Sequence, residues 1–182
     1  MERILFMGMP GAGKGPQAAL LKEKGFYILC TGDIIREGFQ NNNSLLKPYQ
    51  EHIDNGGYLQ NEIIFQLIEQ AISKFPEDAK GYILDGAVRT IEQAKFVKKH
   101  SLADKVIFFT LTEEQAEGRL LNRNQGRADD APEAIKNRFI IYKEKTQPIL
   151  DYLKENFEFY EVDASPTIGE IHKEVFDVIY NK

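Results

Sequence analysis

Five short hydrophobic runs stand out along the chain, and glycine or turn-forming residues bound them. The runs cover residues 4–8, 26–30, 82–84, 106–111 and 157–162. Short apolar runs without polar alternation are typical of strands that are buried on both faces of a sheet. Segments with helical spacing separate the runs, and this alternation favours parallel strands covered by helices on both sides. The pattern therefore predicts an α/β three-layer sandwich around a five-stranded parallel sheet.

The spacing of the runs also predicts two excursions from the sheet. The chain has 182 residues, which suggests a single domain spanning residues 1–182. About fifty residues separate the second run from the third, too many for one crossover helix, so we expect a helical insertion there. Breaks at residues 41–44 and 55–57 bracket one of its helices. A second, polar excursion at residues 122–132 follows the fourth run.

Composition and charge exclude several classes of protein. The net charge is −5, so nucleic-acid binding is not expected. Cys30 is the only cysteine, which excludes an internal disulfide and is typical of a reducing compartment. The first residues lack the features of a secretory signal, and no hydrophobic run approaches the ~18 residues of a membrane span. We therefore expect a cytoplasmic protein without a membrane partner.

The first hydrophobic run ends in a glycine-rich loop. The spacing G-x-x-x-x-G-K fits from Gly8 to Lys14, and apolar residues then resume at helical spacing. Such a loop directs backbone N–H groups at an anion, and the positive end of the following helix lies at the same point. A plain turn is the alternative, but the strand before the loop and the helix after it favour phosphate binding. Lys14 would then reach the β- and γ-phosphates.

Arginines are concentrated in the segments that follow the strands. Six of the seven lie there, at Arg36, Arg89, Arg119, Arg123, Arg127 and Arg138. A charged run is usually a solvated surface, for which lysine serves equally well. Arginine is suited to bidentate recognition of phosphate. The clustering therefore favours phosphoryl transfer over nucleotide binding alone.

Three further polar residues near strand ends have both a structural and a functional interpretation. Asp85 ends the third run and can hold Mg²⁺ through water beside the phosphate loop, or it can be a turn or cap residue. Thr31 can begin a helix or line a binding site. Gln93 can lie on an exposed helix face or contact a ligand. The residues alone leave these alternatives open.

Four motifs resemble, in the same order, those of the adenylate kinase family of the short-lid type. They are Gly13-Lys14-Gly15 with Pro10 and Gln17; Thr31-Gly32-Asp33 with Arg36; Asp85-Gly86 with Arg89, Thr90 and Gln93; and Arg119 and Arg123 with Gly126-Arg127, Asp129-Asp130 and Arg138. The resemblance implies a P-loop kinase fold with an AMP-binding subdomain at residues 31–60 and a short lid at residues 122–132. It also implies reversible phosphoryl transfer from ATP to AMP, which gives two ADP and requires Mg²⁺.

The resemblance assigns roles to individual residues. Those expected to bind ATP are Gly11, Ala12, Gly13, Lys14, Gly15, Pro16, Arg119, Arg123 and Pro166. Those expected to bind AMP are Thr31, Arg36, Gly57, Tyr58, Leu59, Gly86, Arg89, Gln93, Arg127 and Arg138. The group expected to act on the transferring phosphoryl group is Lys14, Arg89, Arg123, Arg127 and Arg138. Asp85 is expected at the Mg²⁺ site, mainly through water. The expected partners are ATP, AMP and ADP, and the family is usually monomeric.

Three departures from the family pattern leave two further alternatives. Pro16 replaces a threonine, Ala87 and Val88 replace a phenylalanine and a proline, and the lid is about two residues shorter than the usual short form. In the family the Phe–Pro bond is cis. A cis bond before a non-proline residue costs about 2.5–4 kcal/mol. We therefore expect a trans Ala87–Val88 bond and a displaced Arg89 loop. These changes favour a weakly active or nucleotide-sensing relative. A UMP/CMP-type kinase is the other alternative, although Thr31 and Gln93 favour AMP.

Overall fold

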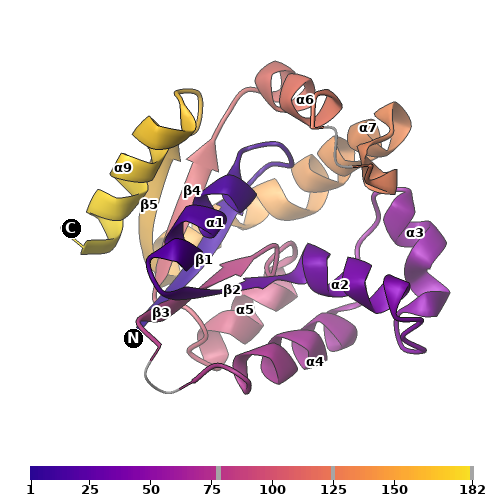
Figure 1. Ribbon diagram of the computed structural model, residues 1–182, viewed down its shortest axis with the longest axis horizontal. Helices are drawn as coiled ribbons and strands as arrows, with labels where there is room; N and C mark the ends of the chain where they lie inside the picture. The colour runs from indigo at the N-terminus through magenta and orange to yellow at the C-terminus, as the bar shows by residue number, and fades with distance from the viewer. Residues whose placement is uncertain (77–78, 124–125, 181–182) are drawn as a thin grey trace.

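A five-stranded parallel sheet forms the centre of the molecule, in the order β2-β3-β1-β4-β5 (Figure 1). The computed structural model describes residues 1–76, 79–123 and 126–180. The strands are β1 (Glu2–Gly8), β2 (Phe26–Cys30), β3 (Gly81–Asp85), β4 (Lys105–Thr110) and β5 (Glu158–Asp163). Each hydrophobic run of the sequence corresponds to one strand, with ends that differ by at most two residues. The predicted sheet is therefore confirmed.

Helices cover both faces of the sheet and enclose two separate hydrophobic cores. The helices α1 (Lys14–Glu23) and α9 (Ile168–Tyr180) cover one face. The other face is covered by α4 (Asn61–Ile72), α5 (Ile91–Lys99) and α8 (Leu150–Asn156). Successive side chains of a strand point to opposite faces, so Ile4 and Phe6 of β1 pack towards α1 and α9, whereas Leu5 and Met7 pack towards α4 and α5. The predicted three-layer sandwich is confirmed.

The strand order places a crevice at the carboxyl ends of the central strands. β1 lies between β3 and β4, so the connections that leave β1 and β3 run in opposite directions across the sheet. Ligands of open α/β sheets bind at such a switch point. Gly8 ends β1, Cys30 ends β2 and Asp85 ends β3, so these three residues lie at this carboxyl edge. The backbone at Gly8 requires glycine, because φ is +142° and a Cβ would lie 2.7 Å from the carbonyl oxygen of Phe109.

The insertion between β2 and β3 is helical, as the spacing predicts. It consists of α2 (Thr31–Gln40), a 3₁₀ turn (Lys47–Tyr49), α3 (Gln50–Asp54) and then α4. In Figure 1, α2 and α3 extend away from the end of the sheet opposite to the chain termini. The insertion therefore projects beyond the carboxyl edge, where the phosphate loop also lies.

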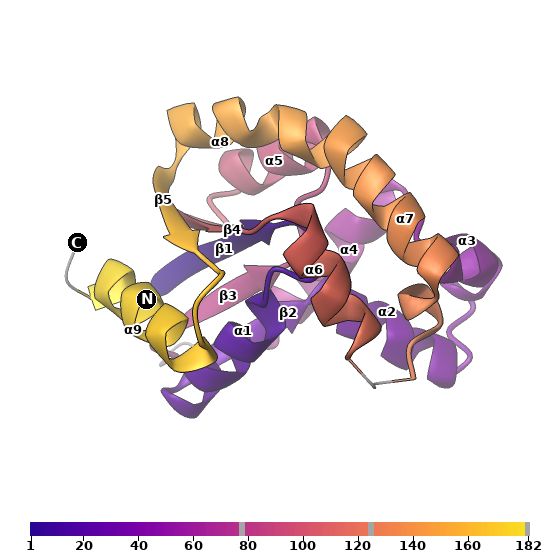
Figure 2. The ribbon, with the colours of Figure 1, turned by 90° about the horizontal axis from the view of Figure 1, so that it is seen from above.

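A long helical path leads back from the second excursion to the sheet. After α6 (Glu113–Leu121) come a 3₁₀ turn (Ala128–Asp130) and α7 (Pro132–Ile141). A π-helical turn (Tyr142–Thr146) and a 3₁₀ turn (Gln147–Ile149) then connect α7 to α8. Figure 2 shows this path as an arch from α8 to α7, which lies beside α3. The predicted lid, residues 122–132, includes 124–125, which lie outside the described residues.

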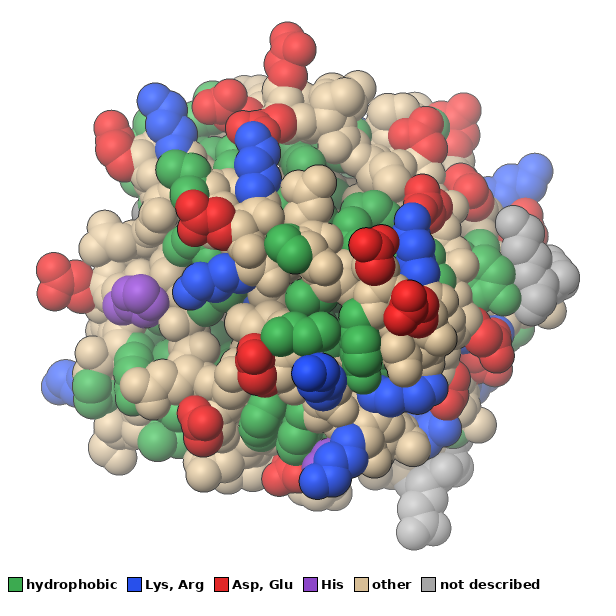
Figure 3. Space-filling model, turned by 180° about the vertical axis from the view of Figure 1, so that it is seen from behind, with side chains coloured by type: hydrophobic (Ala, Val, Ile, Leu, Met, Phe, Trp, Pro, Cys, Tyr) green, Lys and Arg blue, Asp and Glu red, His purple; other side chains and the backbone are tan. Residues whose placement is uncertain are grey.

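The surface opposite to the viewer of Figure 1 carries mixed charges. Acidic and basic side chains are interspersed on it, and its hydrophobic side chains form small separate patches (Figure 3). Across residues 1–76, 79–123 and 126–180, no helix is both long enough and apolar enough to cross a membrane.

Candidate functional site

A cavity of about 680 Å³ opens at the carboxyl edge of the sheet. The phosphate loop, the insertion, the loop after β3, α6 and α7 all contribute to its wall. All the predicted site residues line it except Ala12 and Pro166. The N–H of Ala12 donates to the carbonyl of Met9 at 3.2 Å, so it is engaged within the loop. Pro166 is exposed and lies outside the lining. Segments far apart in the sequence therefore meet at one site.

The phosphate loop is held open by glycines with left-handed backbone. Gly11 and Gly13 have φ of +85° and +84°, and a Cβ on Gly11 would lie 2.5 Å from the carbonyl oxygen of Ala116. The Lys14 Nζ donates to the carbonyls of Gly8 at 2.7 Å and Met9 at 3.0 Å. The ammonium is thus held over the loop, at the start of α1. The geometry suits an anion bound by the loop N–H groups and Lys14 together.

Burial changes the titration of the two charged groups nearest the strand ends. It lowers the pKa of Lys14 to about 8, although Asp85 opposes the shift. It raises the pKa of Asp85, and the attraction of Lys14 and Arg89 opposes that shift. Asp85 is only 8% exposed, so its carboxylate is a strong candidate for binding a cation within the cavity. A ligand that carries negative charge together with a bound cation would stabilise the charged forms of both Lys14 and Asp85.

Pro16 lies at the mouth of the cavity, in the first turn of α1. The first N–H groups of a helix have no partner within the helix, so the missing N–H of proline does not break it. Pro16 therefore occupies a position that is compatible with helix α1. The loop nevertheless offers one backbone donor and one hydroxyl fewer than a threonine would provide.

The inserted helices form the other end of the cavity. Thr31 Oγ1 donates to the carbonyl of Gly86 at 2.8 Å, and a Cβ on Gly86 would lie only 2.9 Å from that hydroxyl. The Gln93 amide is engaged by the protein: Oε1 accepts from Arg89 N at 2.7 Å, and Nε2 donates to Asn61 Oδ1 at 3.0 Å. Asn61 was not identified from the sequence. With respect to the described residues, these two contacts leave Gln93 one N–H and one lone pair for a ligand.

The arginines of the cavity differ in whether a carboxylate neutralises them. Arg138 lies 3.0 Å from Asp129 and 3.3 Å from Asp130, and Arg123 lies 3.5 Å from Asp130. Arg36 pairs with Asp33. The described residues provide no carboxylate partner within 4.0 Å for Arg89, Arg119 or Arg127. Their charge is therefore available to an anion.

The lining as a whole is cationic in an acidic protein. It contains seven lysines and arginines but four aspartates, whereas the net charge of the chain is −5. Burial lowers the pKa of Arg138, Asp129 opposes that shift, and the like charges of Arg89 and Arg123 add to it. Cations held this close together favour a ligand with several negative charges.

The loop that follows Asp85 has the expected peptide geometry. No cis peptide bond occurs in the described part of the chain, so Ala87–Val88 is trans, as expected. Both side chains are buried in the core between the sheet and α4. Displacement of the Arg89 loop relative to other proteins stays a prediction.

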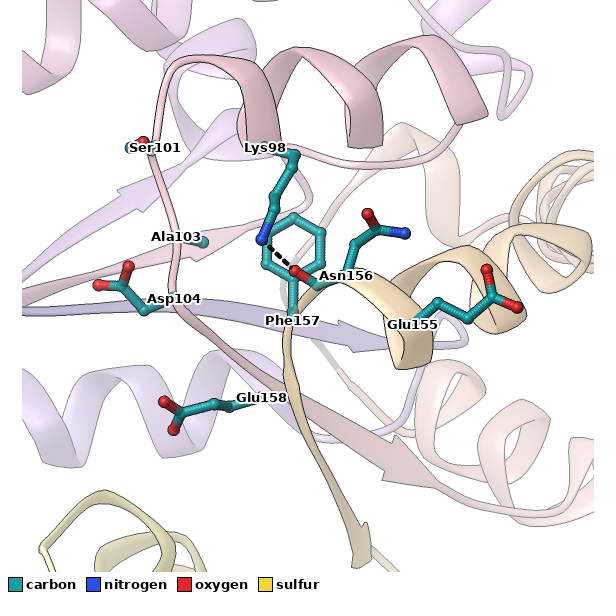
Figure 4. A pocket seen from close by; sticks show the side chains of 8 residues that line it. All are labelled: Lys98, Ser101, Ala103, Asp104, Glu155, Asn156, Phe157 and Glu158. Carbon is teal, nitrogen blue, oxygen red and sulfur yellow. Dashed lines mark hydrogen bonds between the residues drawn. The ribbon is translucent and has the colours of Figure 1, made fainter.

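A second hollow, of about 450 Å³, lies at the opposite edge of the sheet (Figure 4). Its wall comes from the residues just before β4 and β5 and from the end of α5. Lys98 donates to the carbonyl of Asn156, and Asp104 accepts from Arg3 at 2.7 Å. Lys98 and Asp104 are therefore occupied by structural contacts, whereas the cavity at the carboxyl edge brings together the predicted site residues and is the candidate site.

Several lining residues were not assigned from the sequence. Asp33 belongs to one of the sequence motifs, but no role was assigned to it. Burial alone would raise its pKa, but hydrogen bonds from Arg36 and Cys30 together outweigh that effect and hold the pKa below the ordinary value. Thr146 and Tyr142 lie on the π-helical turn, and only Pro148, which disturbs a helix, signals that turn in the sequence. These residues reach the cavity only through the tertiary arrangement of their segments.

Comparison with known proteins gives one consistent result. A family model described as adenylate kinase matches residues 6–158. The adenylate kinase of Flavobacterium johnsoniae is 37% identical over 190 residues, covering 100% of both chains. That of Leptospira biflexa is 35% identical over 179 residues, covering 94% of this chain and 96% of the relative. That of Agrobacterium fabrum is 35% identical over 191 residues, covering 97% of each.

Proposed function

This chain belongs to the adenylate kinase family and is a nucleoside monophosphate kinase, and we propose that it transfers the γ-phosphoryl group of ATP to AMP. The reaction gives two ADP and is reversible. One observation carries the proposal: a single cavity joins a phosphate loop to an inserted helical subdomain, with arginines between them. A protein that bound one nucleotide would not need both ends of this cavity.

The phosphate loop is proposed to bind ATP. Its N–H groups and the start of α1 would hold the β-phosphate, and Lys14 would contact the β- and γ-phosphates. Arg119 lies between this loop and the loop after β5, because its Nη2 donates to Ser165 O at 3.4 Å and its Nη1 would lie 3.8 Å from a Cβ on Gly13. That position suits contact with the base or sugar of ATP.

Residues 31–60 are proposed to form the AMP end. Apolar side chains of α2, α3 and α4 line it, including Ile35, Ile53 and Ile64. Thr31 and the free hydrogen-bonding positions of Gln93 would contact adenine, and Arg36 and Arg89 would contact the phosphate. The apolar walls suit a flat base, and the polar groups would select it.

Transfer between the two ends requires no covalent enzyme intermediate. The AMP phosphate would attack the γ-phosphorus directly while Lys14, Arg123 and Arg138 stabilise the charge on the transferring oxygens. Residues 122–132 would close over the phosphates and exclude water, which would otherwise accept the phosphoryl group; lid gating in adenylate kinase is an established example of this principle.

The residues present fit a Mg²⁺ ion that is held mainly by phosphates and water. Asp85 and Asp33 provide hard carboxylate oxygens at the cavity, and no group of three or more potential ligands occurs in the described part of the chain. Mg²⁺ commonly binds one or two carboxylates together with substrate phosphates. When bound, the ion would offset phosphate charge, and Asp85 would orient its water shell. Members of this family are usually monomeric, so we also propose that the protein acts as a monomer.

Lys14 makes ATP affinity dependent on pH. Burial lowers the pKa of Lys14 from its ordinary value of 10.5 to about 8 in the folded protein. Between these pH values the unfolded chain binds more protons, so the stability of the fold rises with pH. Phosphate attracts only the ammonium form. We therefore expect ATP affinity to be constant below about pH 8 and to fall about tenfold per pH unit above it. Titration calorimetry with ATP alone measures this; a flat profile up to about pH 10 would contradict the assigned role of Lys14.

Pro16 is expected to weaken ATP binding. Pro16→Thr restores an N–H and a hydroxyl beside the phosphates, and a hydrogen bond to a charged group contributes roughly 1.5–3 kcal/mol. We expect ATP to bind at least about tenfold more tightly to this variant. Pro16→Ala restores the N–H alone and separates the two donors. The prediction is wrong if neither variant binds ATP more tightly than the natural protein.

Base selectivity tests the proposed function. Initial rates with ATP and each of AMP, UMP and CMP give kcat/KM for each acceptor. We expect AMP to exceed the pyrimidine nucleotides by at least about a hundredfold, because a site that pairs with polar groups of one base leaves them unpaired with another. A higher kcat/KM for UMP or CMP would show that the chain is a UMP/CMP-type kinase instead.

A further inference from the structure

The helix after the lid changes its hydrogen-bonding pattern where it passes the cavity. α7 continues into the π-helical turn Tyr142–Thr146, and Pro148 follows in the next turn. Pro148 has no N–H to donate, and its ring is incompatible with regular α-helix before it. A π turn accommodates an extra residue, and such turns occur frequently at functional sites. Here the turn brings the Thr146 side chain to the cavity wall.

Thr146 is a polar side chain in a buried position. It is 3% exposed, and its Oγ1 donates to the carbonyl oxygen of Arg89 at 3.0 Å. The hydroxyl oxygen of Tyr58 lies 3.3 Å from the same Oγ1. A carbonyl oxygen cannot donate, so the Thr146 proton goes to Arg89 and the Tyr58 hydroxyl donates to Thr146. A directed chain of hydrogen bonds therefore runs from Tyr58 through Thr146 to the backbone of Arg89.

Tyr58 also contacts the charged end of Arg89. The Cζ atom of Arg89 lies 4.7 Å from the centroid of the Tyr58 ring, within the range of a cation–π interaction. The Nε of Arg89 donates to the Gly86 carbonyl at 3.3 Å. In the described part of the chain no hydrogen bond engages its two terminal nitrogens. These nitrogens carry four of the five guanidinium donors, and Arg89 lines the cavity.

We propose that Thr146 and Tyr58 are positioning residues that hold Arg89 ready to bind the phosphate of the acceptor nucleotide. Thr146 fixes the backbone of Arg89, and the Tyr58 ring fixes the guanidinium. An arginine that is already oriented loses less side-chain freedom when it binds phosphate, so it binds more tightly. This inference rests on the proposed function, which gives the acceptor phosphate to Arg89.

The three residues come from three separate segments. Tyr58 precedes α4, Arg89 precedes α5, and Thr146 ends the π turn. Neither Thr146 nor the Tyr58 hydroxyl reaches the phosphate loop through a described contact. Loss of either hydroxyl should therefore affect the acceptor and spare ATP.

Variants that remove one hydroxyl each test the proposal. Thr146→Val keeps the shape of the side chain, and we expect it to raise KM for AMP about tenfold while KM for ATP changes less than about twofold. Thr146→Ser retains the hydroxyl and should restore KM for AMP. Tyr58→Phe keeps the ring and should raise KM for AMP about threefold. The double variant Thr146→Val/Tyr58→Phe should be no worse than Thr146→Val, because the two residues share one hydrogen bond.

Thr110→Val is the matched control. Thr110 Oγ1 also donates to a backbone carbonyl, that of Val162, at 3.3 Å, but Thr110 lies outside the cavity lining. We expect both KM values of this control to match the natural protein. Equal changes in the two KM values of Thr146→Val, or none in either Thr146→Val or Tyr58→Phe, would overturn the positioning role.

Arg89→Ala separates failure of this inference from failure of the proposed function. If Arg89→Ala leaves KM for AMP unchanged, Arg89 does not bind the acceptor phosphate, and both the assignment and the positioning role fall. If Arg89→Ala raises KM for AMP but the hydroxyl variants do not, the positioning role alone is wrong. If all three raise it selectively, the inference holds.

Discussion

Lys14→Met is expected to lower kcat/KM for ATP by about a thousandfold. The Lys14 ammonium lies over the phosphate loop, held by the carbonyls of Gly8 and Met9, at the position where we propose that charge develops on the transferring group. Removing one preorganised group that stabilises such charge costs about 10²–10³ in rate, and loss of ATP binding adds to this. Steady-state kinetics with saturating AMP measures the effect.

Stability should not explain that loss. Burial lowers the pKa of Lys14, which means that the fold disfavours its charge, and methionine has a similar length without that charge. We expect the thermal midpoint of Lys14→Met to equal or exceed that of the natural protein. Lys22→Met, on the exposed face of the same helix, is the control and should retain activity. A kcat/KM of Lys14→Met within about tenfold of the natural value would refute the role of the phosphate loop.

Arg138→Met is expected to lower both activity and stability. Activity should fall about a hundredfold, because Arg138 is proposed to stabilise the transferring phosphoryl group. Stability should fall by about 2 kcal/mol, because Asp129 and Asp130, at 3.0 Å and 3.3 Å from Arg138, lose a partner. Among the described residues, one oxygen of Asp130 already has no hydrogen-bond partner, and removing one member of a partly buried ion pair is costly. Urea unfolding and steady-state kinetics measure the two effects.

A second substitution distinguishes the two roles of Arg138. In Arg138→Met/Asp129→Asn one uncompensated carboxylate is removed, so stability should recover in part while activity remains low. Lys136→Met, exposed on the same helix, should change neither property. Recovery of activity together with stability would mean that Arg138 serves the fold and not the reaction.

The sheet could be predicted from the sequence because burial on both faces leaves an unambiguous pattern. Ile4, Leu5, Phe6 and Met7 are all buried, although alternate side chains face different helix layers. Burial on both faces therefore gives a continuous hydrophobic run, which indicates a strand clearly. A helix such as α1 exposes much of its surface, so its sequence pattern is more mixed. Strand ends were off by one or two residues because terminal residues such as Glu2, Asp85 and Lys105 are polar and do not extend a hydrophobic run.

The cavity was predictable where a motif records backbone geometry or charge. Gly11 and Gly13 follow from the left-handed turns of the phosphate loop, and the arginines follow from their unusual concentration. The predicted contact of Ala12 with ATP stays a prediction. The hydrogen bond from its N–H to Met9 could not be predicted, because it depends on a loop conformation that spacing does not determine.

The positioning contacts could not be predicted because they depend on tertiary structure. Thr146 is 57 residues from the Arg89 carbonyl that it contacts, and the π turn shifts its direction relative to an ordinary helix. Likewise, the prediction that Gln93 binds AMP gives no sign that Asn61 and Arg89 engage its amide. Hydrogen-bond partners of this kind appear only when the insertion, the loop after β3 and the long helical path are placed together.

Product analysis with the natural protein tests the central claim most directly. The protein is mixed with ATP, AMP and Mg²⁺, and ATP, AMP and ADP are quantified by ³¹P NMR or chromatography over time. We expect two ADP for each AMP consumed, with a turnover of at least about 1 s⁻¹, as is usual for enzymes. Tight binding of AMP without ADP formation would contradict the account and identify the chain as a nucleotide-sensing member of the family.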